Sequence, residues 1–343
     1  MKKVFLMSAA TLVLLSGCKS SKIDYLQTYV PEEGGVRFEK ITDDADMVAS
    51  YNGSLVHKST TGDKGSISWT ILQQVAVSPD GTKLAYINEK NNSTNVMVKS
   101  TQGGPSTQRT FRTNVQSVSW SPDGKTLVFS EKRGGRYGVY LIDAEQGNVV
   151  TPISNGNSDN YAGAISYNGD EVLFYSAESQ TITNGWSAKT TYSYSLWSYN
   201  RRTNLFSNFS RGQTPCPIPG DSTSIYCSRE GEIWRVNLMT GVEEVVVSQK
   251  PKNFYTPQIS PDGQWLLLTG AVRSEKEKMD NTDIFVVRAD GSQLTQLTYH
   301  PGNDLSPVWS SDGKSIYFLS QRGSSKKNYN VWRMDFALGR YSY

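Results

Sequence analysis

Few side chains in this sequence are suited to acid–base or metal chemistry. It has two histidines, His57 and His300, and both fall in segments expected to be loops. Histidines can ligate a metal together with carboxylates, but this pair forms no ligand motif, and solvated loop histidines are the simpler interpretation. The sequence has no Gly-x-Ser-x-Gly elbow and no phosphate-binding glycine loop. We therefore expect no catalytic residue, no metal site and no cofactor.

Aspartate recurs at a fixed place in a short repeat. Copies and near copies of Ser-Pro-Asp-Gly lie at residues 78–81, 121–124, 166–169, 219–222, 260–263 and 310–313. Each copy has at most one carboxylate, which is too few for a calcium loop, since such a loop supplies several oxygens at alternate positions. Proline, aspartate and glycine in this order instead favour a β-turn. The repeated aspartates are therefore predicted to be structural, each in a tight turn between two strands.

Cys18 follows a segment with the features of a signal peptide. Lys2 and Lys3 precede an apolar run that ends at Leu15, and this run is too short to span a bilayer comfortably. Leu15-Ser16-Gly17-Cys18 resembles the lipobox of bacterial lipoproteins. That resemblance implies removal of residues 1–17 and attachment of acyl chains such as palmitate to Cys18, followed by a tether over residues 18–34. The alternative is an ordinary secretory signal with an incidental cysteine.

The residue after Cys18 bears on the destination of the protein. It is Lys19 rather than aspartate, which by similarity to enterobacterial lipoproteins implies sorting to the outer membrane. The following Ser20-Ser21-Lys22 lacks the acidic cluster that resembles surface-export signals. We therefore expect a lipid-anchored protein that faces the periplasm.

Two cysteines remain, Cys216 and Cys227, and they flank the fourth turn repeat. In an oxidising compartment such a pair is a candidate disulfide. A shift of one residue in the strand register would place the two side chains on opposite faces of the sheet. Two buried free thiols are the alternative, and the sequence leaves both open.

The elements that position these residues are strands. A short apolar strand follows each turn, for example Leu127-Val128-Phe129, and a strand with an aliphatic residue before a large one comes next, for example Val139-Tyr140. Six such units at intervals of roughly 40 to 50 residues match the period of propeller blades. The sequence therefore predicts an all-β fold over residues 35–343, a six-bladed propeller of four-stranded antiparallel blades.

The last repeat leaves too few residues to complete a blade. Val36 to Thr42 alternates in polarity as an outer strand does. We expect this N-terminal strand to supply the missing fourth strand and to close the ring, which would remove two open sheet edges.

The loops between the predicted strands are unequal in length. The extra sequence is concentrated in residues 45–70, 177–193, 271–282 and 321–329. In a four-stranded meander these segments all lie on one face of the ring. Because function is often carried by variable loops, we predict that this long-loop face contacts partners, with His57, Trp186, Tyr192 and His300 as candidate residues. Passive insertions are the alternative.

The chain has 343 residues and a formal charge of +3. Removal of the basic signal segment would leave it close to neutral, which argues against a nucleic-acid partner. The tandem Ser-Pro-Asp-Gly repeats, each followed by an apolar and then an aromatic-centred strand, resemble the TolB-type, WD40-like β-propeller family. That resemblance covers about residues 36–338.

Propellers of that family bind other envelope proteins, among them the peptidoglycan-associated lipoprotein. The resemblance therefore implies a non-enzymatic interaction module whose partner is an envelope protein, another lipoprotein or an outer-membrane complex. Two departures are the short tether in place of the family's N-terminal domain and the lipid anchor. The alternative is a propeller that binds or processes a glycan or peptide in its central funnel, and Trp186, Tyr192 and Tyr194 could stack on sugar rings.

Overall fold

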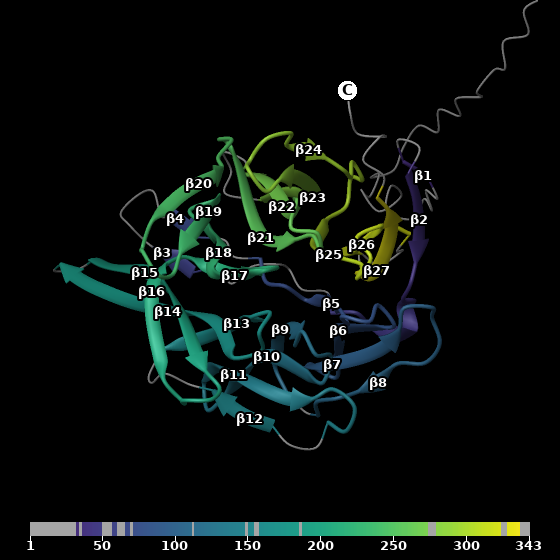
Figure 1. The fold of residues 1–343 in the computed structure, drawn as a ribbon, viewed down its shortest axis with the longest axis horizontal. Coiled ribbons are helices and arrows are strands. Elements are labelled where there is room, and N and C mark those ends of the chain that lie inside the picture. Colours follow the sequence, from purple (N-terminus) through teal and green to yellow (C-terminus); the bar gives the residue numbers. More distant parts are fainter. Residues whose placement is uncertain are drawn as a thin grey trace, which may run out of the picture.

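The computed structural model describes residues 32–33, 36–49, 57–59, 66–68, 71–111, 113–147, 150–153, 158–184, 187–273, 279–323 and 328–336. Four-stranded antiparallel sheets are arranged around a central axis (Figure 1). Six sheets form the blades, so the predicted fold is confirmed. Among the described residues no helix is long and apolar enough to cross a membrane.

Each blade runs outward from the axis in chain order. Blades 1 to 3 consist of β5 (Val75–Val77), β6 (Lys83–Lys90), β7 (Ser93–Ser100) and β8 (Thr107–Gln108); β9 (Val115–Trp120), β10 (Thr126–Arg133), β11 (Arg136–Asp143) and β12 (Val150–Ile153); and β13 (Asp159–Ile165), β14 (Glu171–Asn184), β15 (Ser187–Asn200) and β16 (Phe206–Arg211).

Blades 4 and 5 repeat the same order. They consist of β17 (Gln213–Ile218), β18 (Asp221–Arg229), β19 (Glu232–Asn237) and β20 (Glu243–Val247); and β21 (Lys252–Ile259), β22 (Trp265–Arg273), β23 (Met279–Arg288) and β24 (Thr295–Gln296). Blade 6 has only three strands from the C-terminal part of the chain, which are β25 (Asp304–Trp309), β26 (Ser315–Ser320) and β27 (Asn330–Asp335).

The N-terminal strand completes blade 6, as predicted. β2 (Val36–Lys40) pairs antiparallel with β27, and β1 (Glu32–Glu33) lies outside it. Val36 and Phe38 on β2 are buried in the core cluster that blades 5 and 6 share. The chain then forms the 3-10 helix η1 (Asp44–Asp46), and the short hairpin of β3 (His57–Ser59) and β4 (Ser66–Ser68) follows.

The repeated turns connect the first and second strands of their blades and share one hydrogen-bond network. At residues 78–81 the Gly81 N–H donates to the Ser78 carbonyl (2.8 Å). The Ser78 hydroxyl donates to Asp80 (2.5 Å) and accepts from the Lys83 N–H (2.9 Å). Gly81 has a φ of +74°, which a residue with a Cβ adopts only at a cost. The same contacts recur in blades 2, 3, 5 and 6, so the predicted structural role of these carboxylates is confirmed.

In the third blade the structure differs from the prediction, which placed a loop over residues 177–193. β14 and β15 pair continuously from Glu171↔Asn200 to Asn184↔Ser187, so most of the predicted loop is a long hairpin that extends beyond β13 and β16. β-Branched residues such as Thr181, Thr183 and Thr191 favour this extended pairing.

The closing strand gives the first prediction. The Phe38 ring packs edge-on against Phe318, with ring centroids 6.2 Å apart, and the Arg322 guanidinium lies 4.0 Å from its centroid. We expect Phe38→Ala to lower the free energy of unfolding by about 3–5 kcal/mol, since it leaves a cavity between β2 and the core of blade 6. Chemical denaturation measures this change. Arg37→Ala, at an exposed position of the same strand, serves as the control and should stay within about 0.5 kcal/mol of wild type.

The turn network gives the second prediction. Hydrogen bonds from the turn serines hold the pKa values of Asp80, Asp123 and Asp312 below the usual 3.8. Because the folded-state pKa is the lower one, each carboxylate stabilises the fold above the unfolded-state pKa, and this contribution is lost as pH falls through the folded-state pKa. Asn168 shows that asparagine is compatible with the turn. Replacing all three aspartates by asparagine should lower the free energy of unfolding most at neutral pH and progressively less below about pH 4. Urea denaturation at pH 7 and pH 3 tests this, and a stability difference that does not change with pH would contradict it.

Candidate functional site

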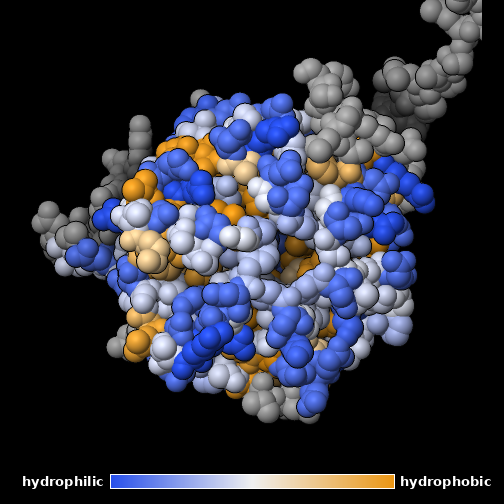
Figure 2. All heavy atoms as spheres, viewed as in Figure 1, coloured by the Kyte–Doolittle hydropathy of each residue, from blue (hydrophilic) through white to orange (hydrophobic). Residues whose placement is uncertain are grey.

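The innermost strands surround a cavity on the ring axis. Its volume is about 310 Å³, and all six blades contribute to its wall. It lies at the end of these strands that carries the Ser-Pro-Asp-Gly-type turns, which we call the turn face, and several turn residues line it, among them Pro79, Pro122 and Pro261. Figure 2 shows a hollow near the centre of the ring with apolar residues in its walls and polar residues around it.

The floor of the axial cavity is a segment from the N-terminal part of the chain. Ile71 and Leu72 are each 1% exposed and pack into two different core clusters. The Leu72 carbonyl accepts from the Ser306 hydroxyl (2.8 Å) of blade 6, and the Gln73 carbonyl accepts from the Val118 N–H (3.0 Å) of blade 2. The segment is therefore hydrogen-bonded to blades 2 and 6, while Leu72 packs in the core that blades 3 and 4 share, so the segment crosses the channel.

Backbone bulges on three inner strands shape the wall. Thr214, Thr256 and Ser306 are buried and have φ of about +50°, an unusual conformation for a residue with a Cβ. The ladder register shifts at each of these positions. A proline follows each bulge, and the next two residues, such as Gln258-Ile259 in blade 5, line the cavity. The bulges thus re-aim the strand ends toward the axis.

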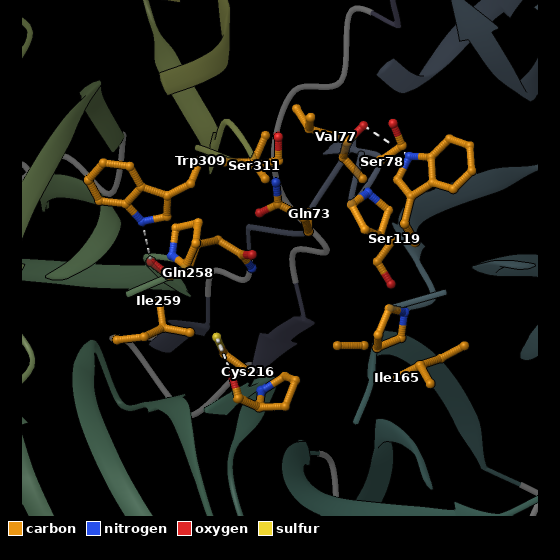
Figure 3. Close-up of a pocket in the computed structure, with 18 of the residues that line it drawn as sticks. Gln73, Val77, Ser78, Ser119, Ile165, Cys216, Gln258, Ile259, Trp309 and Ser311 are labelled. Atoms are coloured by element: carbon orange, nitrogen blue, oxygen red, sulfur yellow. Dashed lines mark hydrogen bonds between the residues drawn. The ribbon is translucent and has the colours of Figure 1, made fainter. Parts of the chain in front are cut away.

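The side chains of the wall are mainly apolar. Trp120 and Trp309 lie in the wall, and each indole N–H donates to a backbone carbonyl of the preceding blade, Ala76 (3.2 Å) and Gln258 (3.1 Å). Figure 3 shows Ile165, Ile259 and Val77 around the same space. These contacts hold the aromatic walls rigidly.

The polar groups of the wall are uncharged. The Gln73 amide donates to the carbonyls of Val75 (2.7 Å) and Ser306 (3.2 Å), and its Oε1 has no hydrogen-bond partner among the described residues. The Ser119 hydroxyl is likewise without a partner among them. The Gln258 amide also points into the cavity (Figure 3). The wall therefore offers fixed hydrogen-bonding groups on an apolar background, which is the composition of a specific binding pocket.

Among the described lining residues the only titratable groups are Tyr167 and Cys216. Burial raises the pKa of Cys216 to about 12, so its thiol is neutral near pH 7. The described residues also contain no group of three or more His, Cys, Asp or Glu that could hold a metal ion.

Of the predicted partner-face residues, His57, Tyr192 and His300 are not among the residues that line this cavity. His57 begins β3, where its backbone pairs with Ser68, and Trp186 lies outside the described residues, as does Cys18. Tyr192 is half-buried on the projecting part of β15, opposite Ser179.

His300 is not the exposed residue that the sequence suggested. It is 4% exposed, and its Nδ1 accepts from the Gly302 N–H (3.0 Å). Burial lowers its pKa, and the buried Asp304–Arg322 ion pair (2.6 Å) lies in the same blade. The interpretation of His300 as a solvated loop histidine is therefore wrong, because the linker into blade 6 buries it, and its role as a partner-face residue stays a prediction.

Of the two alternatives that the sequence left open for Cys216 and Cys227, the structure has the buried free thiols. Cys216 and Cys227 are both buried and free. A bulge shifts the register so that Cys216 lies opposite Tyr226 rather than Cys227. Consequently Cys216 packs in the core between blades 4 and 5, and Cys227 packs in the core between blades 3 and 4.

The sequence analysis did not predict the axial cavity. Loop length favoured the opposite face, where the described residues include a cleft of about 280 Å³ between blades 1 and 6. The available signal was the pair Thr-Pro or Ser-Pro shortly before a turn repeat, at Thr214-Pro215, Thr256-Pro257 and Ser306-Pro307. A proline that follows a bulge marks a place where the inner strand stops pairing regularly.

Comparisons with known proteins agree with this architecture. The family model described as the TolB beta propeller domain matches residues 56–232 and 221–343, so the chain belongs to that family. The Tol-Pal system protein TolB of Francisella tularensis is 24% identical over 212 residues, which is 60% of this chain and 45% of that protein. A 67-residue segment, 20% of this chain and 10% of the relative, is 34% identical to dipeptidyl-peptidase 5 of Porphyromonas gingivalis. The chain thus spans less than half the length of these curated relatives.

Solved structures show the same fold at low sequence identity. A putative TolB from Agrobacterium tumefaciens has a TM-score of 0.55 and 17% identity, over 80% of this chain and 95% of that one. An oligogalacturonate lyase in complex with manganese has a TM-score of 0.54 and 11% identity, over 92% of this chain and 96% of that one. At these identities the likeness shows the fold alone.

The thiols provide the third prediction. Burial raises the pKa of both Cys216 and Cys227 to about 12, so below about pH 9 the reactive thiolate is about a thousandfold scarcer than in a cysteine of pKa near 9. In a Cys18→Ser variant we expect slow alkylation by iodoacetamide in the folded state, with a rate that rises about tenfold per pH unit between pH 8 and 10. Timed intact-mass measurements report this rate, and unfolding in urea should release both thiols at once. Alkylation that requires prior reduction would reveal a disulfide and contradict the structure.

Proposed function

We propose that this member of the TolB β-propeller family is a lipid-anchored interaction module of the cell envelope, and that it holds a segment of a partner protein in the axial cavity of its turn face. The observation that carries the proposal is the wall of this cavity, in which rigid apolar side chains surround a few uncharged polar groups, among them the Gln258 amide. A backbone group of an extended segment would hydrogen-bond to this amide, and the apolar atoms of the segment would be buried against Trp120 and Trp309.

The size and neutrality of the cavity favour a short uncharged segment. About 310 Å³ accommodates one or two side chains rather than a folded domain. A charged group would lose its hydration there without gaining an ionic partner from the described wall, which is unfavourable. The partner is therefore expected to insert an uncharged residue and to rest on the surrounding turns.

The envelope setting is supported from two directions. The lipobox-like sequence at Leu15 to Cys18 implies an acylated N terminus, and two or more acyl chains would anchor the protein durably. The relative from Francisella tularensis is named as a protein of the Tol-Pal system. We infer an outer-membrane anchor, a propeller that faces the periplasm, and a partner that is an envelope protein, such as another lipoprotein or an outer-membrane complex.

An enzyme that works in the channel is the competing function, since lyases share the fold. General acid–base catalysis needs a titratable group within hydrogen-bond reach of the substrate. The described wall offers Tyr167 and Cys216, and the thiol of Cys216 is held neutral near pH 7 by burial. This composition supports a binding role over a catalytic one.

Blocking the cavity provides the fourth prediction. Ser119→Trp on β9 should place an indole in the cavity and prevent insertion of a partner segment. Thr151→Trp, at an exposed position on β12 of the same blade, is the matched control. After crosslinking in cells, quantitative mass spectrometry of the purified protein should show at least a tenfold loss of one envelope partner with Ser119→Trp and wild-type recovery with Thr151→Trp.

Thermal denaturation of both variants checks that they are folded. If folded Ser119→Trp keeps every partner of the wild type, the axial cavity is not the binding site, and the proposal fails.

A further inference from the structure

The axial cavity continues outward between blades 5 and 6. A cleft of about 230 Å³ lies between the turns of these blades on the turn face. It shares Pro261, Trp309 and Ser311 with the axial cavity. An extended segment that occupies the cavity can therefore place a neighbouring side chain in the cleft.

Aromatic side chains form the inner wall of the cleft. The rings of Trp309 and Phe336 meet at 78° with centroids 4.8 Å apart, and Trp265 meets Phe336 at 67° with centroids 6.3 Å apart. The Arg288 guanidinium lies 4.7 Å from the centroid of Trp265, which shows that this wall already accepts a cation within the protein.

Two carboxylates stand at the mouth of the cleft. Asp262 and Asp312 line it and are exposed. One oxygen of each, Oδ1, accepts the turn hydrogen bonds, from Ser260 (2.5 Å) in blade 5 and from Ser310 (2.6 Å) in blade 6. Neither aspartate forms an ion pair with a described residue, and no lysine, arginine or histidine is among the described residues that line the cleft. The mouth therefore carries negative charge that no ion pair within the described chain neutralises.

We propose that this cleft binds a cationic side chain, lysine or arginine, of the partner segment whose uncharged residue occupies the axial cavity. The inference rests on the proposed function and adds the chemistry of its partner, an uncharged residue with a basic residue nearby. Aromatic rings stabilise a cation over their faces, and the paired carboxylates attract it while the aliphatic stem lies along the apolar wall. This charge complementarity selects a basic segment over an apolar or acidic one.

A substitution that removes the charge and keeps the turn is available from the chain itself. In blade 3 the side chain of Asn168 occupies the aspartate position and makes the same contacts, from the Ser166 hydroxyl (2.6 Å) and the Asp170 N–H (3.1 Å). The test variant is therefore Asp262→Asn with Asp312→Asn. Asp80→Asn with Asp123→Asn makes the same change in blades 1 and 2, at aspartates that do not line the cleft, and is the matched control.

The test is selection of peptides from a phage-displayed library of random twelve-residue sequences against the full-chain protein. The wild type should enrich sequences with lysine or arginine close to an uncharged aromatic or aliphatic residue. A synthetic peptide from this set should bind the cleft variant about tenfold more weakly, and the control variant within about twofold of wild type. Its citrulline or acetyl-lysine analogue should bind the wild type and the cleft variant equally.

The outcomes separate this inference from the proposed function. Enriched peptides without basic residues, or a basic preference that survives in the cleft variant, would overturn the cationic subsite while leaving the axial cavity in place. Peptides that bind Ser119→Trp as well as they bind wild type would overturn the axial site itself. A wild-type selection that enriches no sequence would contradict both.

Discussion

Without β2 the ring would have a gap. Blade 6 receives three strands from the C-terminal part of the chain, and pairing of β2 with β27, in which Phe38 is opposite Met334, supplies the fourth. Each blade buries its faces only against its neighbours, so the cores between blades depend on a closed circle. The same pairing covers a sheet edge that would otherwise recruit other chains. The stability of the whole ring therefore rests on contacts between residues about 290 positions apart, such as the hydrogen bond from the Val331 N–H to the Thr42 hydroxyl.

The N-terminal region also determines where a ligand can enter. After closing blade 6 the chain passes along the side opposite the turn face, where Val48 pairs with Asn88 of blade 1, and it returns to the axis at Ile71 and Leu72. These two residues seal the channel, so that the remaining cavity opens toward the turns. The turns of blades 1, 2, 3, 5 and 6 are rigid because the hydroxyl of the first serine donates to the aspartate or asparagine of the same turn. A rigid rim around a neutral, apolar cavity requires little reorganisation on binding.

Much of the fold could be predicted from the sequence because it is built from local signals. Proline, aspartate and glycine indicate the turns, and the spacing of the turns indicates the number of blades. The pairing of β2 with blade 6 could be predicted because the last repeat has too few residues to form four strands. The register of blade 4 could not be predicted, since the buried bulge at Thr214 has no local signature beyond the following proline, and it separates Cys216 from Cys227. The axial cavity could not be predicted either, because it depends on where Ile71 and Leu72 cross the axis.

The central claim is that recognition takes place on the axis at the turn face. Site-specific photocrosslinking in living cells tests it most directly, with p-benzoylphenylalanine placed either at Gln258, whose side chain points into the cavity, or at Asn91, in the cleft on the opposite face. The structure predicts that position 258 crosslinks to an envelope protein and that position 91 does not. Crosslinks from position 91 alone would place the partner on the opposite face and contradict the account.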